Sequence, residues 1–511
     1  MTRHPGDGVP RGLGWASWAL SLLLAAALLS GCGTAVVNPV TGETERSALD
    51  EAAEIEVGRQ AHQQVLAEQG RYPDSAVQAY VNGVGQKLAA QSHRAQLKWT
   101  FTVLDSPEVN AFALPGGYVY VTRGILAYLE SEAELAGVIG HEIGHVTARH
   151  GAQRATRQQN AGIGVMAATV FGALLEGIGV PGATDLFGRA SQGLAAGYVA
   201  SYSREQELQA DRLGAEYLVR NRYDPQNMAE VIGVLKGQER FAAEQAKAEG
   251  RQAPSGSHWL SSHPSNDQRL EDIRRIAATY PQADWSDDGR ARYLRAVDGL
   301  TFGDSRSQGV TRGRHFFHEE LGIALTAPPL WRVVNSAESI SVVNPEGDAA
   351  LVLRSLPASA GATHEEILRT LVQPVDGRRE RRNLNGLPAT HFEGTRQVSQ
   401  NQQQSVSLTL VTGPGQRQYL IQHAARDAQA LKRSASGLGQ AEASFRPLSV
   451  AERSAARPWS LRTVPLPRGG WAELARSSPL PSQPEAQLRL LNGLYNGARE
   501  PRPGEAVKVV R

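Results

Sequence analysis

The 511-residue chain contains a single cysteine, Cys32, so no disulfide can form within it. It has no Gly-x-Ser-x-Gly nucleophile elbow and no phosphate loop of the Gly-Lys-Ser type, which excludes the enzyme classes that depend on them. A formal net charge of +2 lacks the basic excess expected of a nucleic-acid-binding protein. No internal repeat of solenoid period is present. The length allows about three domains, each with a sizeable core.

The N-terminus has the pattern of an export signal. Two arginines precede an apolar run at 13–29, which is shorter than a comfortable membrane span but typical of a secretory signal peptide, predicted at 1–31. The run ends in Leu-Ser-Gly-Cys32, which resembles a bacterial lipoprotein box. That resemblance implies lipidation of Cys32 and a tether to a membrane outside the cytoplasm, and Gly33 resembles the outer-membrane sorting type. An uncleaved anchor is the alternative.

Residues 141–145 read His-Glu-Ile-Gly-His within an apolar, helix-forming stretch. Helix positions i and i+4 lie on one face, so His141 and His145 can present two imidazole nitrogens to one zinc ion. Glu142 is then placed beside the metal, where a carboxylate can take a proton from water. Ser131 is the expected N-cap of this helix. Glycines at 137, 140 and 144 favour helix poorly and predict that another element packs very close.

A catalytic zinc site needs three protein ligands and one open position, so a third donor must lie elsewhere. The best candidate follows Ser203, where Glu207 and Asp211 share one face of a predicted helix. We expect Glu207 to bind the metal and Asp211 to accept the second ring N–H of a ligand histidine. Glu205 is the alternative ligand. A solvated acidic helix face is the alternative without function.

Taken together, these motifs resemble the zinc endopeptidase family of BepA, HtpX and the CAAX prenyl protease, and within it the periplasmic BepA-like branch. Two further segments are similar to the family's edge strand and its downstream His-Pro motif, namely Asn110-Ala111-Phe112-Ala113-Leu114 followed by Pro-Gly-Gly, and Ser262-His263-Pro264 followed by Arg269-Leu270. The resemblance covers roughly residues 45 to 300. It implies one Zn²⁺ per chain, peptide-bond hydrolysis, and misfolded or misassembled envelope proteins as substrates.

The two added segments also have physical interpretations. Backbone at 110–114 could pair with an extended substrate and hold the scissile peptide over the metal, although an ordinary hairpin with a Pro-Gly-Gly turn is the alternative. His263 could donate to the oxyanion, or bind the open zinc position and hold the enzyme shut. A structural histidine beside a helix cap is its alternative.

The rest of the chain suggests two further domains. Residues 301–450 carry short alternating stretches that predict an antiparallel sheet with helices on one face, and a basic cluster at 378–382 is interpreted as a solvated loop. Residues 455–511 resemble a LysM module, a β-α-α-β unit that binds N-acetylglucosamine polymers, with Gly469-Gly470 replacing its usual Gly-Asp. A small packing domain that has lost its ligand is the alternative. An apolar stretch at 161–180 is interpreted as buried helices or a lid.

The predicted fold class is therefore α+β, with a mainly helical metalloprotease domain at 32–300, an accessory domain at 301–450 and a small module at 455–511. The predicted function is a zinc-dependent endopeptidase on the periplasmic side of the cell envelope, in an outer-membrane lipoprotein. The alternatives are a chaperone or assembly factor that uses the cleft to hold its clients, and a peptidoglycan-bound scaffold, each with latent protease activity. Predicted partners are envelope proteins, the membrane through the lipid anchor, and peptidoglycan through the module; no nucleic acid is expected.

Overall fold

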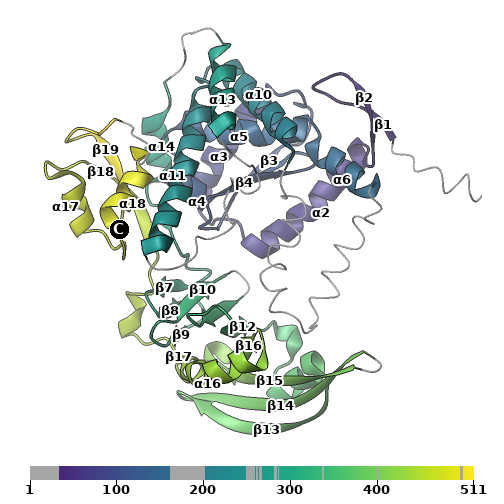
Figure 1. Ribbon diagram of the computed structural model, residues 1–511, viewed down its shortest axis with the longest axis vertical. Helices are drawn as coiled ribbons and strands as arrows, with labels where there is room; N and C mark the ends of the chain where they lie inside the picture. The colour runs from purple at the N-terminus through teal and green to yellow at the C-terminus, as the bar shows by residue number, and fades with distance from the viewer. Residues whose placement is uncertain are drawn as a thin grey trace, which may run out of the picture.

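A computed structural model describes residues 34–160, 202–248, 259, 263, 267–280, 285, 287–336, 339–399, 402–494 and 499–511. The predicted signal peptide, Cys32 and the stretch at 161–180 lie outside the described residues. The described part mixes helices with several largely antiparallel sheets, which confirms the α+β class (Figure 1). None of its helices combines the length and the apolar character that a membrane crossing requires.

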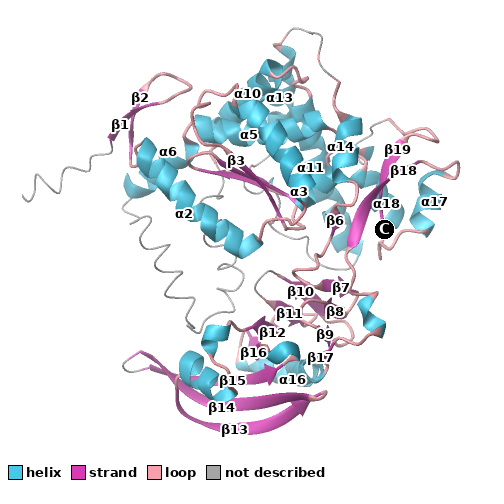
Figure 2. Ribbon diagram, turned by 180° about the vertical axis from the view of Figure 1, so that it is seen from behind, coloured by secondary structure: helices cyan, strands magenta, loops and turns pink. Residues whose placement is uncertain are grey.

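The first half of the chain forms a helical body around a three-stranded sheet of order β3-β5-β4 (Figures 1 and 2). Strand β3 runs parallel to β5, and β4 pairs antiparallel with β5 at the sheet's edge. The strands are β3 (Thr100–Leu104), β4 (Ala111–Leu114) and β5 (Tyr118–Thr122), after an N-terminal hairpin of β1 (Thr34–Val37) and β2 (Thr44–Ser47). The helices are α2 (Glu51–Gln69), α3 (Ser75–Ala89), α4 (Arg123–Tyr128), α5 (Glu132–Thr147), α6 (His150–Asn160), α10 (Arg204–Arg220), α11 (Asn227–Ala248), α13 (Asp267–Ala278) and α14 (Arg290–Val297).

Helices α5 and α10 carry the predicted site, and both begin at the predicted caps. The Ser131 side chain accepts from the backbone N–H of Glu134, and Ser203 forms a capping box with Gln206. Helix α5 is buried along nearly its whole length, because the sheet, α3, α10 and α11 surround it. The two caps therefore fix where each helix starts, and so which residues face the neighbouring helix.

The glycines of α5 allow α10 to approach closely, as predicted. A Cβ placed on Gly144 would lie 2.9 Å from the carbonyl oxygen of Ala210, and one on Gly140 would lie 3.3 Å from that of Gly214. Such separations leave no room for a larger side chain without displacing backbone. The close approach brings the His141 and His145 face of α5 against the Glu207 and Asp211 face of α10.

Residues 310–447 form two antiparallel sheets rather than the one sheet predicted. The smaller has the order β17-β9-β8-β7 and the larger β10-β11-β12-β16-β15-β14-β13. Their strands are β7 (Val310–Arg312), β8 (His315–His318), β9 (Ile323–Thr326), β10 (Arg332–Asn335), β11 (Ile340–Val343), β12 (Ala349–Ser355), β13 (Pro374–Leu384), β14 (Leu387–Ser399), β15 (Gln402–Thr412), β16 (Gln418–Ala425) and β17 (Arg446–Pro447). The basic cluster at 378–382 lies in the exposed edge strand β13, so its interpretation as a loop was wrong.

The prediction that helices cover one face of the sheet was also wrong. Side chains of α16 (Ala428–Ala443) cluster with Val411, whereas those of α15 (His364–Ile367) and the π-helical turn η2 (Leu368–Val372) cluster with Leu410. Neighbouring residues on a strand point to opposite faces, so helices cover both. Around Leu410 and Val411 the larger sheet is apolar on both faces, so a helix must shield each face from water.

The C-terminal segment packs into the core of the helical body. Its elements follow the expected β-α-α-β order: β18 (Trp459–Pro465), α17 (Gly470–Arg476), α18 (Pro484–Leu491) and β19 (Ala506–Val510). Strand β18 pairs with β19 and with β6 (Thr301–Phe302). Leu461, Trp471 and Val509 belong to the same buried cluster as residues of α5. The buried Lys508 donates to the carbonyls of Ala127 and Leu129 at 2.9 and 2.6 Å.

Candidate metal centre

Four buried donor atoms converge from α5, α10 and His263, which lies four positions before α13. They come from His141, His145, Glu207 and His263, and all lie within 4.8 Å of one another. Nε2 of His141 lies 3.0 Å from Nε2 of His145 and 3.2 Å from Nδ1 of His263. The Glu207 carboxylate completes the group, with Oε1 3.0 Å from His263 Nδ1 and 3.5 Å from His145 Nε2. Two imidazoles of one helix turn and a carboxylate 62 positions beyond the second thus face one centre.

Asp211 lies behind His141, where the sequence predicted a ligand-orienting carboxylate. One of its oxygens is 2.9 Å from His141 Nδ1. Arg269 donates to both Asp211 oxygens at 2.9 and 2.8 Å and contacts Glu207 at 2.8 Å. Burial works to raise the pKa of Asp211, but the Arg269 guanidinium holds it below its usual value. Asp211 therefore stays ionised and leaves Nε2 of His141 to face the other donors.

Burial raises the pKa of Glu207 to about 7, against the opposing effect of Arg269. A carboxylate that is costly to hold ionised in this pocket is stabilised in its charged form by a bound cation. Burial also lowers the pKa of His263 to about 3 and holds that of His145 well below its usual range, so both rings are neutral near pH 7. Metal coordination requires neutral imidazoles and an ionised carboxylate, so this donor set fits a metal ion.

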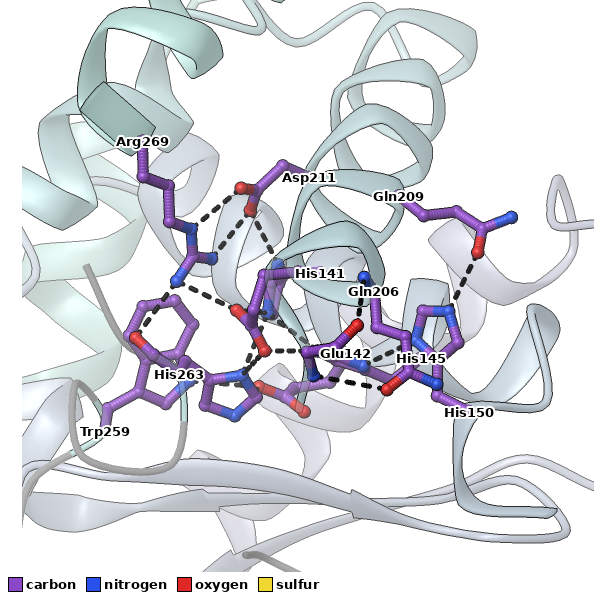
Figure 3. Close-up of polar contacts among 12 residues, drawn as sticks. His141, Glu142, His145, His150, Gln206, Gln209, Asp211, Trp259, His263 and Arg269 are labelled. Carbon is purple, nitrogen blue, oxygen red and sulfur yellow. Dashed lines mark hydrogen bonds and ion pairs between the residues drawn. The ribbon is translucent and has the colours of Figure 1, made fainter. Parts of the chain in front are cut away.

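His145 is backed by a second histidine. Its Nδ1 lies 2.9 Å from Nδ1 of His150, whose Nε2 lies 2.9 Å from Oε1 of Gln209. Burial lowers the pKa of His150 to about 4. The ring of Tyr202 stacks on His145 with centroids 3.8 Å apart. Figure 3 shows His150 and Gln209 on the side of the centre away from Arg269.

Glu142 lies next to the donor group without belonging to it. Nε1 of Trp259 donates to its Oε1 at 3.0 Å, and Nε2 of His263 is 3.5 Å from the same oxygen. Burial raises the pKa of Glu142, which makes the carboxylate a stronger proton acceptor. The Trp259 ring stacks on His263 with centroids 4.6 Å apart (Figure 3). His263 thus reaches the donor group through Nδ1 and Glu142 through Nε2.

The predicted substrate-binding segment forms β4, the edge strand of the three-stranded sheet, which packs against α5. Ala111 and Ala113 face the core shared with α5, while Phe112 and Leu114 pack with α2. Both side-chain faces of β4 are covered, so its backbone edge is the part that another strand could use. Asn110 precedes the strand, and among the described residues none donates a hydrogen bond to its buried Oδ1.

Glu205, the alternative ligand, is exposed on α10 and is absent from the donor group. Five residues around the centre carry no role in the sequence-based prediction: His150, Tyr202, Gln209, Trp259 and Arg269. Their sequence signals are weak, because a histidine five residues beyond the pentapeptide or an arginine six beyond His263 has no fixed helical relation to the ligands.

Comparison with known proteins shows what part of the chain is similar to. Residues 75–277 match the family model described as peptidase family M48. The chain contains a peptidase M48 domain. It is similar to the beta-barrel assembly-enhancing protease of Yersinia pestis, with 28% identity over 267 residues that cover 50% of this chain and 52% of that protein. It is also similar to the protein of that name from Escherichia coli K12, with 27% identity and 47% of each chain covered.

Mitochondrial metalloendopeptidase OMA1 of Schizosaccharomyces pombe is 32% identical over 238 residues, which cover 45% of this chain and 62% of that protein. The chain thus spans about half to three fifths of the length of these relatives. The predicted resemblance to BepA-like metalloendopeptidases is confirmed. The residues that match the family model include His141, Glu142, His145, Glu207 and His263.

Proposed function

We propose that the chain is a zinc-dependent endopeptidase of the bacterial cell envelope that hydrolyses misfolded or misassembled envelope proteins. One observation carries the proposal, namely the convergence of His141, His145 and Glu207 on one centre with Glu142 beside it. Two imidazoles and a carboxylate are the ligands that catalytic zinc uses in peptidases. A tetrahedral zinc ion with bonds of about 2.1 Å spaces its donors by roughly 3.4 Å, and the donor pairs here are 3.0 to 3.6 Å apart. The substrate class is what the family resemblance implies, and the bacterial relatives' name, beta-barrel assembly-enhancing protease, supports it.

Zinc, when bound, supplies the Lewis acidity that activates water and polarises the scissile carbonyl. Glu142 accepts the proton of the attacking water, and its raised pKa suits it to return that proton to the leaving amine. The Trp259 N–H fixes the orientation of the Glu142 carboxylate. Asp211 and Arg269 hold the ring of His141 in position.

The backbone edge of β4 is proposed to align the substrate. An extended peptide can pair with Ala111 to Leu114 through main-chain hydrogen bonds, which tolerate many side chains. The unpartnered Oδ1 of Asn110 supports this role, because a buried acceptor is stabilised by an incoming N–H. A substrate held this way would be selected for being unfolded rather than for its sequence.

The proposal is tested with Glu142→Gln, which keeps an oxygen for Trp259 to bind and removes the proton acceptor. We expect casein cleavage to fall by about 10²- to 10⁴-fold while zinc content stays near one per chain. Glu205→Gln, on the exposed face of α10, is the matched control and keeps full activity. Cleavage by Glu142→Gln at the wild-type rate would rule out the enzyme.

His263 supports a second function, that of an assembly factor whose protease is latent. Its Nδ1 lies 3.2 Å from His141 and 3.0 Å from Glu207, the position that a substrate carbonyl or attacking water needs. If His263 closes the centre, His263→Ala cleaves casein faster than wild type at saturating zinc. If His263 instead stabilises the oxyanion, the same variant is slower. Rescue of outer-membrane protein assembly by Glu142→Gln would establish the non-enzymatic function.

We further propose a lipid anchor at Cys32 and a position on the periplasmic side of the outer membrane, on the evidence of the N-terminal pattern. Metabolic labelling with a fatty-acid analogue tests this proposal. Wild type incorporates label and Cys32→Ser does not; labelling of both proteins would contradict the anchor.

A further inference from the structure

The two predicted histidine ligands have different chemical support. Nδ1 of His141 faces the Asp211 carboxylate, whose charge is compensated by Arg269. Nδ1 of His145 faces another ring nitrogen, Nδ1 of His150, at 2.9 Å. Two ring nitrogens at this separation share one proton, so one of them donates and the other accepts. The direction of that bond decides which nitrogen of His145 is free to bind a metal.

Gln209 sets the direction. Its carbonyl oxygen lies 2.9 Å from Nε2 of His150, and an amide oxygen only accepts, so Nε2 of His150 carries a proton. A neutral imidazole has one ring proton, which leaves Nδ1 of His150 as an acceptor. Nδ1–H of His145 therefore donates to His150. The lone pair of His145 then lies on Nε2, which is 3.0 Å from Nε2 of His141 and 3.5 Å from Glu207.

We propose that His150 and Gln209 are positioning residues that hold His145 in its metal-binding tautomer. The inference rests on the proposed metal site and extends it beyond the ligands themselves. Tyr202 contributes by stacking on the face of the same imidazole, with an interplanar angle of 20°. This contact blocks rotation of the ring as well. His145 is thereby held by an imidazole and a phenol ring.

A neutral support suits the charge of the centre. Glu142, Glu207 and Asp211 already bring three carboxylates into the buried site, and Arg269 is within contact distance of the latter two. A carboxylate in place of Gln209 would add a further negative charge to the site, at a cost in desolvation energy. An amide supplies the acceptor that the tautomer needs and adds no charge.

The first experiment measures zinc affinity of the full chain by competition with a chromogenic chelator. Gln209→Leu removes the acceptor at a half-buried position, and His150→Phe keeps a ring but removes both nitrogens. Each is expected to weaken zinc binding by about 10- to 100-fold, the usual effect of losing a partner of a ligand histidine. Gln209→Glu keeps an acceptor and is expected to bind zinc at least as tightly as wild type. Glu205→Gln, on the same helix but exposed, is the control.

The second experiment reads the tautomer directly in zinc-free protein by ¹⁵N NMR of the histidine rings. Wild type is expected to show His145 protonated at Nδ1 and His150 protonated at Nε2, and Gln209→Leu to lose that preference. Equal thermal stability of the zinc-free proteins shows that the fold is intact. A merely structural role for Gln209 would leave the tautomer unchanged.

The results separate this inference from the proposed function. If wild type binds zinc but Gln209→Leu and His150→Phe bind it equally well, the positioning role is refuted while the metal site stands. Equal loss in Gln209→Leu and Gln209→Glu would also refute it, because the acceptor would then be irrelevant. If wild type binds no zinc, the proposed function fails first.

Discussion

Lys508, three residues before the last residue given, is expected to be the strongest link between the C-terminal segment and the metal helix. Its ammonium group is fully buried, donates to the carbonyls of Ala127 and Leu129, and pairs with Glu130 at 2.7 Å. These residues end α4 and directly precede Ser131, the cap of α5. Removing Lys508 therefore disturbs the point at which the metal helix begins.

Lys508→Met keeps the aliphatic stem and removes the charge. Breaking a buried ion pair by removing one partner costs about 3–5 kcal/mol, because the remaining carboxylate is left uncompensated. Glu130 also pairs with Arg290, so we expect the lower half of that range. For a body of more than 200 residues, each 1 kcal/mol lowers the Tm by about 2–4 °C, so a loss of about 3–4 kcal/mol predicts a drop of roughly 6–16 °C.

Differential scanning fluorimetry measures the Tm of the full chain, and hydrogen exchange locates the change at residues 127–134. Lys432→Met, at an exposed position on α16, is the matched control and should leave the Tm within 1 °C, as is usual for surface substitutions. A Tm for Lys508→Met equal to that of the control would refute the role assigned to this side chain. In the double variant with Glu130→Gln, part of the loss should be recovered, since the orphaned charge is absent.

Three further predictions concern the helices of the centre. Burial raises the pKa of Glu134 to about 8, above the ordinary 4.5. Between about pH 5 and 8 the unfolded chain releases this proton while the folded protein keeps it, so the folded state loses stability as pH rises. Glu134→Gln should flatten the pH dependence of the unfolding free energy over that range, and an unchanged slope would contradict this. Gly144→Ala should destabilise the protein by about 1–3 kcal/mol in denaturant unfolding, because its Cβ would meet Ala210. Gly439→Ala, with open space around it, is the control and should be neutral or stabilising by up to about 1 kcal/mol. Equal effects of the two substitutions would show that the helices can move apart at no cost. Arg269→Gln should weaken zinc binding in chelator competition by about 10- to 100-fold because Asp211 and Glu207 lose their shared cation; unaltered binding would exclude Arg269 from orienting the ligands.

The part of the centre that follows helical periodicity was accessible from the sequence. His141 and His145, and likewise Glu207 and Asp211, are pairs at i and i+4, so each pair was expected on one face. The glycines of α5 indicated that another element packs very close, and that element is α10. The contacts of Arg269 and Trp259 were not accessible, because they depend on how segments more than fifty residues apart pack in three dimensions.

Strand pattern predicted the accessory domain less completely. Short alternating stretches were predicted to be strands, and β12 is one of them, with residues that alternate between buried and half-buried. Strand β13 was missed, since an edge strand exposed at almost every position has no apolar alternation, and its arginines are typical of a loop as much as of a protected edge. The second sheet, and the helices on the second face of the larger sheet, were not predicted for a related reason. Alternation shows that a strand has an apolar face, but not which other element covers it.

The packing of the C-terminal segment bears on how a peptidoglycan-binding role must be examined. Leu461, Trp471, Leu488 and Val509 are buried together with core residues of the M48 domain, and Lys508 is buried against α4. A fragment from 455 to 511 made alone would expose these side chains and an unpaired ammonium group that the full chain covers. Its adherence to murein would report exposed apolar surface, and its failure to adhere could follow from misfolding. Only the full chain presents the surface that a glycan would meet, so binding must be measured with the segment in its place on the protease.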